Sequence, residues 1–147
     1  MRRLIWCGLL AMAAAAGPAM AQKLPAGAVT TEHYYRIKWG SSDEFMRLYS
    51  ANHEPLLKEM QKQGRILSVR SEVPFTHMAG GARWDLRVTI TYRDAASAVV
   101  VGGDFDKAFD AAEARLYPDK VKFEAEEARR FSLLDEHWDV IVTPAGD

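Results

Sequence analysis

The sequence has 147 residues, of which 48% are hydrophobic and 27% are charged, and its formal net charge is −1. This length suits a single domain, and the apolar content is ample for a packed core, so wholesale disorder is excluded. The near-neutral charge and the absence of basic runs exclude the concentrated Lys and Arg of a nucleic-acid surface. One cysteine excludes a disulfide framework and a thiolate zinc finger.

The first 21 residues have the features of a secretory signal peptide. Arg2 and Arg3 form a positive start, an apolar run follows, and residues 19–21 (Ala-Met-Ala) form a small-x-small cleavage site. The apolar run from Leu4 to Ala16 is shorter than the roughly 20 residues that span a bilayer, so no membrane attachment is expected after cleavage. We predict cleavage after Ala21, which removes the only cysteine, and a periplasmic or secreted mature chain.

A short tether, residues 22–28, precedes one domain over residues 29–147. From Val29 to Trp39 apolar and polar side chains alternate with a period of two, which predicts a strand ended by Gly40. The apolar set of this strand is His33, Tyr35, Ile37 and Trp39.

A helix is expected next. Ser41 and Glu44 have the spacing of a capping box, apolar residues then recur at helical intervals, and Gly64 suits the helix C-terminus. Pro55 lies inside this helix and predicts a kink near residues 51–54.

Two further strands are predicted over Ile66–Val73 and Trp84–Tyr92, because both segments alternate with a period of two. The loop between them contains His77 and the pair Gly80-Gly81.

The C-terminal third is expected to be mainly helical. Asp94 can cap a helix that Gly102-Gly103 interrupts, Asp104–Tyr117 continues it, and Pro118 is expected in the first turn of one more helix. A final strand is predicted over residues 136–143. The expected buried face of the last helix is Val121, Ala125, Ala128 and Phe131.

The resulting order is strand, helix, strand, strand, helices, strand. This is the ferredoxin-like βαββαβ unit, an α+β fold with an antiparallel sheet, helices on one face and an extra helix before the last strand. The three tryptophans Trp39, Trp84 and Trp138 are expected in the core under the helices.

Three segments carry a resemblance to a known group of proteins. The strand Tyr34–Lys38, the helix with Phe45 and Tyr49, and the H-x-P-L element of His53–Leu57 resemble the first half of dimeric α/β-barrel proteins, nearest to the EthD-like and NIPSNAP-like branches. The resemblance implies a homodimer whose sheets enclose a lumen, and activities that include isomerases, cyclases and cofactor-free or haem-degrading monooxygenases. Fold alone selects none of these reactions.

The polar face of the sheet offers a candidate ligand site. Arg36, Arg70 and Arg87 suit recognition of an anionic group, and Tyr34 and His137 are placed on the same face. The alternative is a solvated face in which acidic neighbours neutralise the arginines.

The histidines offer a candidate for proton transfer. His53 adjoins the expected kink, where its imidazole can act as a general base or merely brace the turn. His33 is expected to pack and His77 to be a loop residue. His137 opens the last strand on the polar face, where it can form an orienting pair with Asp139 or stand beside it by chance. No His-x-His or His-x-x-x-His spacing occurs, so neither a metal nor a cofactor is expected.

Two functions remain open at this stage, and whether the chain is an enzyme is undecided. The first is an exported dimeric barrel that binds a small anionic or aromatic ligand in its lumen, with isomerase- or monooxygenase-type chemistry implied by the resemblance. The second is a non-catalytic periplasmic module that docks another protein through its charged sheet face.

Overall fold

The computed structural model describes residues 24–76 and 78–143, so the predicted signal peptide, Cys7 and His77 lie outside the described residues. Within the described residues no helix is both long and apolar enough to cross a membrane.

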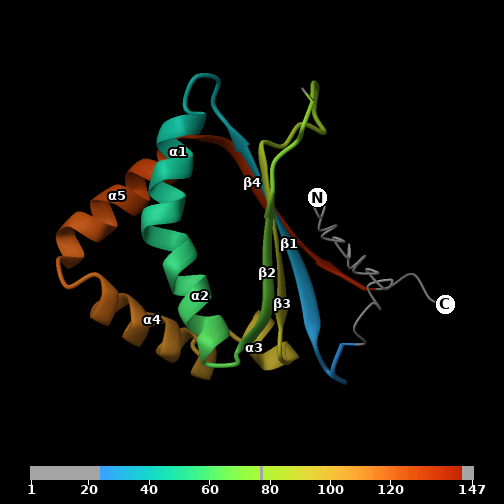
Figure 1. The fold of residues 1–147 in the computed structure, drawn as a ribbon, viewed down its shortest axis with the longest axis vertical. Coiled ribbons are helices and arrows are strands. Elements are labelled where there is room, and N and C mark those ends of the chain that lie inside the picture. The colour runs from blue at the N-terminus through green and yellow to red at the C-terminus, as the bar shows by residue number, and fades with distance from the viewer. Residues whose placement is uncertain (1–23, 77, 144–147) are drawn as a thin grey trace, which may run out of the picture.

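The described chain forms one four-stranded sheet and a set of helices (Figure 1). The strands lie in the order β2-β3-β1-β4, and each pair of neighbours is antiparallel, which is the ferredoxin-like arrangement and confirms the α+β prediction. In chain order the elements are β1 (Val29–Ile37), α1 (Ser42–Leu48), the π-helical turn η1 (Tyr49–His53), α2 (Glu54–Lys62), β2 (Ile66–Glu72), β3 (Leu86–Tyr92), α3 (Ala95–Val99), α4 (Asp104–Leu116), α5 (Lys120–Ser132) and β4 (Leu134–Val142).

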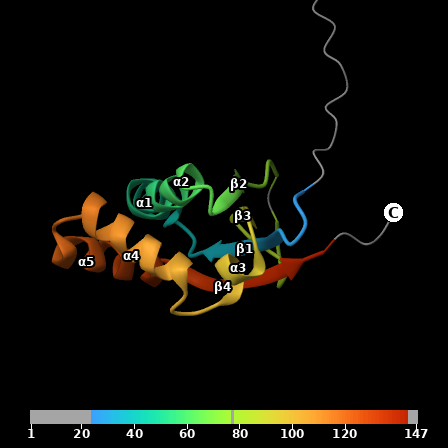
Figure 2. The same cartoon turned by 90° about the horizontal axis from the view of Figure 1, so that it is seen from below.

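The larger helices cover one face of the sheet. Figure 1 shows α1, α2, α4 and α5 together on one side, with α5 beside α1 and α4 beside α2, and Figure 2 shows the same helices from below. Phe45 of α1, Met60 of α2 and Leu86 of β3 have no exposed surface and form the centre of the core between the layers. We call this covered side of the sheet the helix face and the opposite side the outer face.

The long first helix changes its winding where the kink was predicted. Five residues, Tyr49–His53, form a π-helical turn that ends two residues before Pro55, and the chain continues as α2 although the proline has no amide donor. Gly64 ends α2 with φ +69°, the left-handed conformation that favours glycine. The predicted capping box is wrong, because the Ser41 side chain caps nothing and Glu44 instead accepts hydrogen bonds from Arg129 of α5.

The side chains of the last strand lie on the opposite faces of the sheet from those predicted. β4 starts at Leu134, which pairs with Ile37, and an extra residue at Asp135 shifts the register so that His137 pairs with Tyr35. Such a bulge moves all later side chains to the other face. His137 therefore lies on the helix face, and Trp138 lies on the outer face.

The other two tryptophans are also outside the core. Trp39 is 76% exposed beneath the Arg83 guanidinium, whose carbon lies 4.3 Å from the ring centroid. Trp84 lies before β3 and packs edge-on against Tyr34 of the outer face, with ring centroids 6.1 Å apart. The tryptophan prediction was thus wrong at all three positions.

Helix α5 buries a different set of residues from the one predicted. Its buried residues are Phe123 and Arg130, whereas Val121 is 79% exposed and Phe131 is half-exposed. The helix begins at Lys120 with the Asp119 side chain accepting from the amide of Lys122, so Pro118 precedes the helix rather than opening it.

Candidate functional site

The predicted arginines do lie on one face of the sheet, the outer face, but each is paired with an acid. Arg70 contacts Glu72 at 3.0 Å, and Arg87 donates to the same carboxylate from Nε at 3.0 Å. Arg36 forms an ion pair with Glu136. The second interpretation of the polar face, neutralisation by neighbouring acids, therefore accounts for these three arginines within the described chain.

Tyr34 is also engaged on the outer face. Its hydroxyl donates to Glu32, and its ring stacks on Trp138 with centroids 5.2 Å apart and planes 5° from parallel. The hydrogen bond to Glu32 raises the pKa of this tyrosine. The structure thus brings together Tyr34, Arg36 and the other outer-face arginines, and separates them from His53 and His137.

A partly enclosed cavity of about 180 Å³ lies on the helix face, between the sheet and the helices. Its walls are mostly aromatic and aliphatic, and its polar groups are three imidazoles, two phenols and one guanidinium. The lining residues are His33, Tyr35, His53, Leu57, Val88, Ile90, Tyr92, Phe105, Phe109, Arg130, Phe131 and His137. Apolar walls with a few converging polar groups are typical of small-molecule sites.

His53 reaches this cavity from the π-helical turn. Its ring lies between Tyr49 and Phe109, with centroid distances of 5.5 and 6.4 Å. Burial, with a further contribution from the positive charge of Arg130, lowers the pKa of His53 to about 3. The ring is therefore neutral at physiological pH, and no hydrogen bond to it is present within residues 24–76 and 78–143.

Arg130 is the charged group of the cavity and is only 1% exposed. It donates to Glu127 from Nε at 3.0 Å and from Nη2 at 2.6 Å, which leaves the pair without net charge. Its third nitrogen, Nη1, is buried without a hydrogen-bond partner among the described residues. Buried donors are normally satisfied, so this nitrogen is an exception among the described residues, and Arg130 is also one of the residues that line the cavity.

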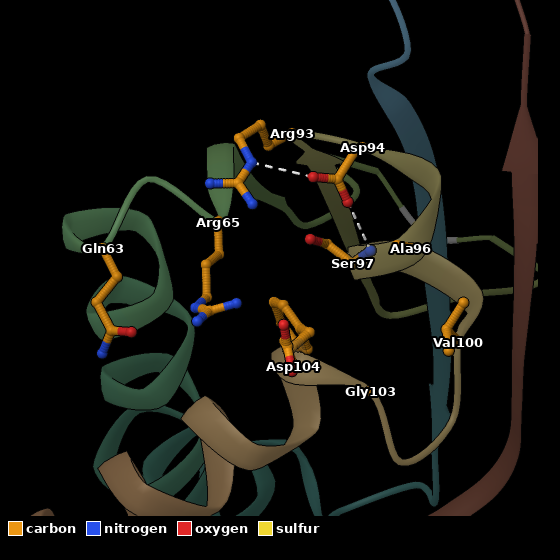
Figure 3. Close-up of a pocket in the computed structure, with 10 residues that line it drawn as sticks. Gln63, Arg65, Arg93, Asp94, Ala96, Ser97, Val100, Gly103 and Asp104 are labelled. Carbon is orange, nitrogen blue, oxygen red and sulfur yellow. Dashed lines mark hydrogen bonds and ion pairs between the residues drawn. The ribbon is translucent and has the colours of Figure 1, made fainter.

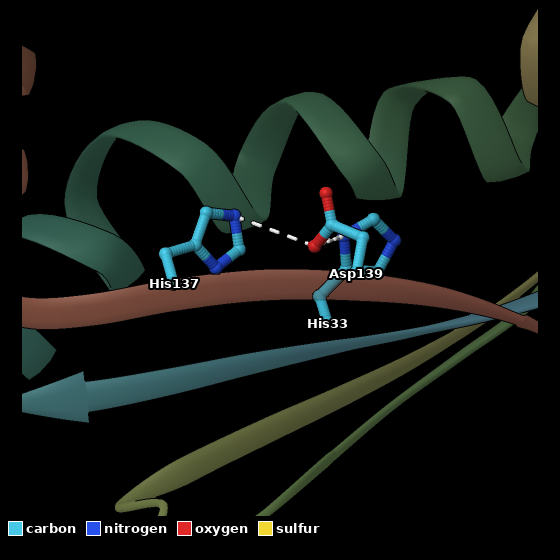
Figure 4. A group of neighbouring side chains, drawn as sticks. All are labelled: His33, His137 and Asp139. Atoms are coloured by element: carbon cyan, nitrogen blue, oxygen red, sulfur yellow. Dashed lines mark ion pairs between the residues drawn. The ribbon is translucent and has the colours of Figure 1, made fainter.

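At the edge of the cavity, His33, His137 and Asp139 form a cluster (Figure 4). The register places Asp139 of β4 directly opposite His33 of β1, and His137 is two residues away on the same face. Asp139 Oδ1 lies 2.8 Å from His33 Nδ1 and 3.4 Å from His137 Nε2. Of the two alternatives for His137 and Asp139, the described residues have them in contact, but on the helix face and with His33 added.

A second, larger hollow of about 360 Å³ lies beside α3 (Figure 3). Its polar groups belong to the local turn: Arg93 donates to Asp94 at 3.0 Å, and Asp94 accepts from the Ser97 amide at 2.8 Å as the cap of α3. This capping lowers the pKa of Asp94 to about 2. Since Asp94 and Asp104 line it beside Arg65, the hollow lacks the uniform charge of an anion site.

Two groups of the site were missed in the sequence. Arg130 belongs to a predicted helix, but its position on the buried face was not recognised because arginine is seldom fully buried. His33 was interpreted as a packing residue. The available signal was the pair His137 and Asp139, two residues apart on an edge strand. The sequence did not show that His33 lies opposite Asp139 on the neighbouring strand.

No protein-family model and no curated protein matches the chain. Among solved structures it is similar to a NIPSNAP family protein from Agrobacterium tumefaciens, with 14% identity, 81% of this chain and 87% of that chain covered, and a TM-score of 0.48. It is similar to a DABB family protein with a ferredoxin-like fold from Mesorhizobium loti (12% identity, 82% and 99% covered, TM-score 0.45). A dimeric ferredoxin-like protein of unknown function from Thermobifida fusca is also similar (12% identity, 84% and 96% covered, TM-score 0.48). At these identities and TM-scores the likeness carries no conclusion about activity, ligand or partner.

Proposed function

We propose that this protein binds a small single-ring aromatic or enolic molecule, carrying an oxygen acceptor, in the cavity between its sheet and its helices. The observation that carries the proposal is the buried Arg130, whose Nη1 has no partner among the described residues, beside the mostly aromatic and aliphatic residues that line the cavity. We therefore propose a ligand on the helix face, in place of the lumen on the outer face that the resemblance implies.

The size of the cavity supports a ligand of this class. An apolar cavity of about 150 Å³ is sufficient to hold benzene, and this one has about 180 Å³. The rings of Tyr92, Phe105 and Phe109 offer faces and edges against which an aromatic ligand can pack.

The polar groups define how the ligand is oriented. Arg130 Nη1 offers a donor to a ligand oxygen, and the neutral ring of His53 offers one donor and one acceptor. A base with a pKa of about 3 holds a proton poorly at neutral pH, so we assign His53 to hydrogen bonding. The role of His53 as a general base stays a prediction, and the low pKa that burial gives this ring argues against it.

Binding of phenol, benzoate and benzene, measured by calorimetry in the presence of a chelator, tests the proposal. The double variant Arg130→Met with Glu127→Gln removes both charges together and should weaken phenol and benzoate by at least about tenfold, the equivalent of 1.4 kcal/mol. Benzene should be affected much less, because it has no oxygen. Arg129→Met is the matched control, since Arg129 is exposed and pairs with Glu44. Absence of saturable binding of all three probes to the wild type would overturn the proposal.

We also propose that the outer face forms a homodimer interface. Tyr34 and Trp138 stack there, and Val140 is 40% exposed. The ion pairs Arg70–Glu72 and Arg36–Glu136 add both positive and negative side chains to the same face. A surface of mixed sign around an apolar centre can be complementary to a second copy of itself across a two-fold axis. Val140→Lys should weaken the dimer by at least about tenfold in sedimentation equilibrium, whereas Val121→Lys on α5 should not. A wild-type monomer would instead favour docking of a different protein on this face.

Export is proposed from the sequence features of residues 1–21. The intact mass of the protein isolated from its own cells should correspond to the 126 residues that follow Ala21. An uncleaved chain would remove the periplasmic or secreted assignment.

A further inference from the structure

We propose that His33, His137 and Asp139 form a binding site for a divalent first-row transition metal ion, such as Zn²⁺, Fe²⁺ or Co²⁺, at the edge of the cavity. The proposal goes beyond ligand binding in the cavity and does not depend on it. It replaces the expectation, based on spacing along the chain, that no metal is bound.

The pairing of two strands assembles the three ligands. His33 and Asp139 are direct cross-strand partners, and His137 lies two residues from Asp139 on the same face. The ligand atoms, one from each residue, all lie within 4.8 Å of one another. Tetrahedral metal–ligand bonds of about 2.0–2.2 Å place neighbouring ligand atoms about 3.3–3.6 Å apart. The 3.4 Å between His137 Nε2 and Asp139 Oδ1 matches this separation. The 2.8 Å between His33 Nδ1 and Asp139 Oδ1 is a hydrogen-bond distance that widens by about 0.5 Å when a metal takes the place of the proton.

The hydrogen bonds behind the imidazoles already have the orientation that a metal requires. His137 Nδ1 lies 2.9 Å from the carbonyl oxygen of Tyr34, which only accepts, so Nδ1 donates to it and Nε2 is the nitrogen that faces Asp139. His33 Nε2 lies 2.7 Å from the hydroxyl of Thr31. When Nδ1 binds a metal, Nε2 carries the proton and donates a hydrogen bond to this hydroxyl. Such outer hydrogen bonds fix the tautomer and orientation of metal-binding histidines.

The chemistry of the three ligands indicates the class of metal. Two imidazoles and one carboxylate favour transition metals over Mg²⁺ and Ca²⁺, which prefer oxygen ligands.

The cluster leaves room for further ligands of the metal. The side chains of His33, His137 and Asp139 are 18, 25 and 52% exposed, so one side of the cluster is open to solvent. His33 and His137 also line the cavity, so a metal ion here borders the proposed ligand. Three protein ligands with open positions are typical of metal sites that bind water or substrate.

Titration of the chelator-treated mature protein with Co²⁺ and Zn²⁺ tests this site without any organic ligand. We expect one equivalent of metal per chain, and visible Co²⁺ absorption bands that report nitrogen and oxygen coordination. Asp139→Asn and His137→Gln should each weaken the affinity by at least about 100-fold, because loss of an outer hydrogen bond alone costs about 10–100-fold. Thr31→Val, which removes only that outer partner of His33, should cost about tenfold.

Glu136→Gln is the matched control, since Glu136 neighbours His137 but pairs with Arg36 on the outer face. Circular dichroism confirms that each variant is folded. Absence of stoichiometric binding, or equal affinity in wild type and Asp139→Asn, would show that the cluster is only an ion pair of His33 with Asp139. Either result leaves the calorimetry with phenol unaffected, because that experiment is done in chelator.

Discussion

The two faces of one sheet use charged residues in opposite ways. On the outer face Arg70 and Arg87 pair with Glu72 close to water, so their charges are screened and satisfied. On the helix face a single arginine, Arg130, is fully buried, and its pairing with Glu127 leaves one nitrogen without a partner. The contrast shows that a row of charged residues along a sheet face can consist of paired surface charges, whereas a buried arginine with an unpaired nitrogen is the rarer arrangement, and the ligand proposal rests on it.

The largest effect is expected from the core that holds the helices on the sheet. Phe45→Ala removes a ring with no exposed surface and should lower the free energy of unfolding by about 3–5 kcal/mol. Urea denaturation measures the change. Phe75→Ala is the control, because Phe75 is fully exposed. A small effect at Phe45 would mean that the helices do not pack on the sheet as described.

The buried ion pair should respond differently to single and double substitution. Arg130→Met leaves Glu127 without its partner and should destabilise the protein by about 3 kcal/mol, whereas Arg130→Met with Glu127→Gln should recover most of that loss. Thermal unfolding of the single and the double variant measures the two changes in stability. Equal stability of the single and double variants would show that the pair is not buried as a unit.

The buried imidazole should make stability depend on pH in a defined direction. The pKa of His53 is lowered to about 3 from 6.5, so between these values the unfolded chain binds a proton that the folded chain does not. Stability is therefore lost as pH falls below about 6.5, by about 2 kcal/mol at pH 5 from this group.

His53→Gln, which does not titrate, should flatten the dependence of the unfolding free energy on pH between 7 and 4. The difference between wild type and variant isolates His53 from the other titrating groups. The NMR signal of the His53 imidazole is the one that is missing from the spectrum of His53→Gln. If that signal titrated near pH 6.5 in the wild type, it would contradict the burial of the ring.

The smallest effect is expected on the outer face. Arg70 is 68% exposed at its side chain, so Arg70→Gln should change Tm by about 2 °C or less. It should also leave the affinity for phenol within about twofold. If Arg70→Gln lost as much phenol binding as the Arg130 and Glu127 double variant, the result would indicate that the ligand binds on the outer face instead.

The sequence predicted the elements of the fold well because their signals are local. Alternation of side chains marks β1, β2 and β3 within two residues of their observed bounds, and Gly64 marks the end of α2. The disturbance before Pro55 was expected at the right place, since a missing amide donor acts on its own helix. The sequence thus determined which segments are strands and helices, their order, and hence the ferredoxin-like fold.

The site was decided by contacts between distant parts of the chain. The bulge at Asp135 inverts the facing of β4, and only the register of β4 with β1 brings Asp139 opposite His33. The burial of Arg130 depends on how α5 lies against α1, which its helical pattern does not show. Local periodicity is set by the backbone of each segment, but the phase of an edge strand and the buried side of a helix are set by long-range hydrogen bonding and packing. For that reason the tertiary structure alone placed His33, His137, Asp139 and Arg130 beside one cavity.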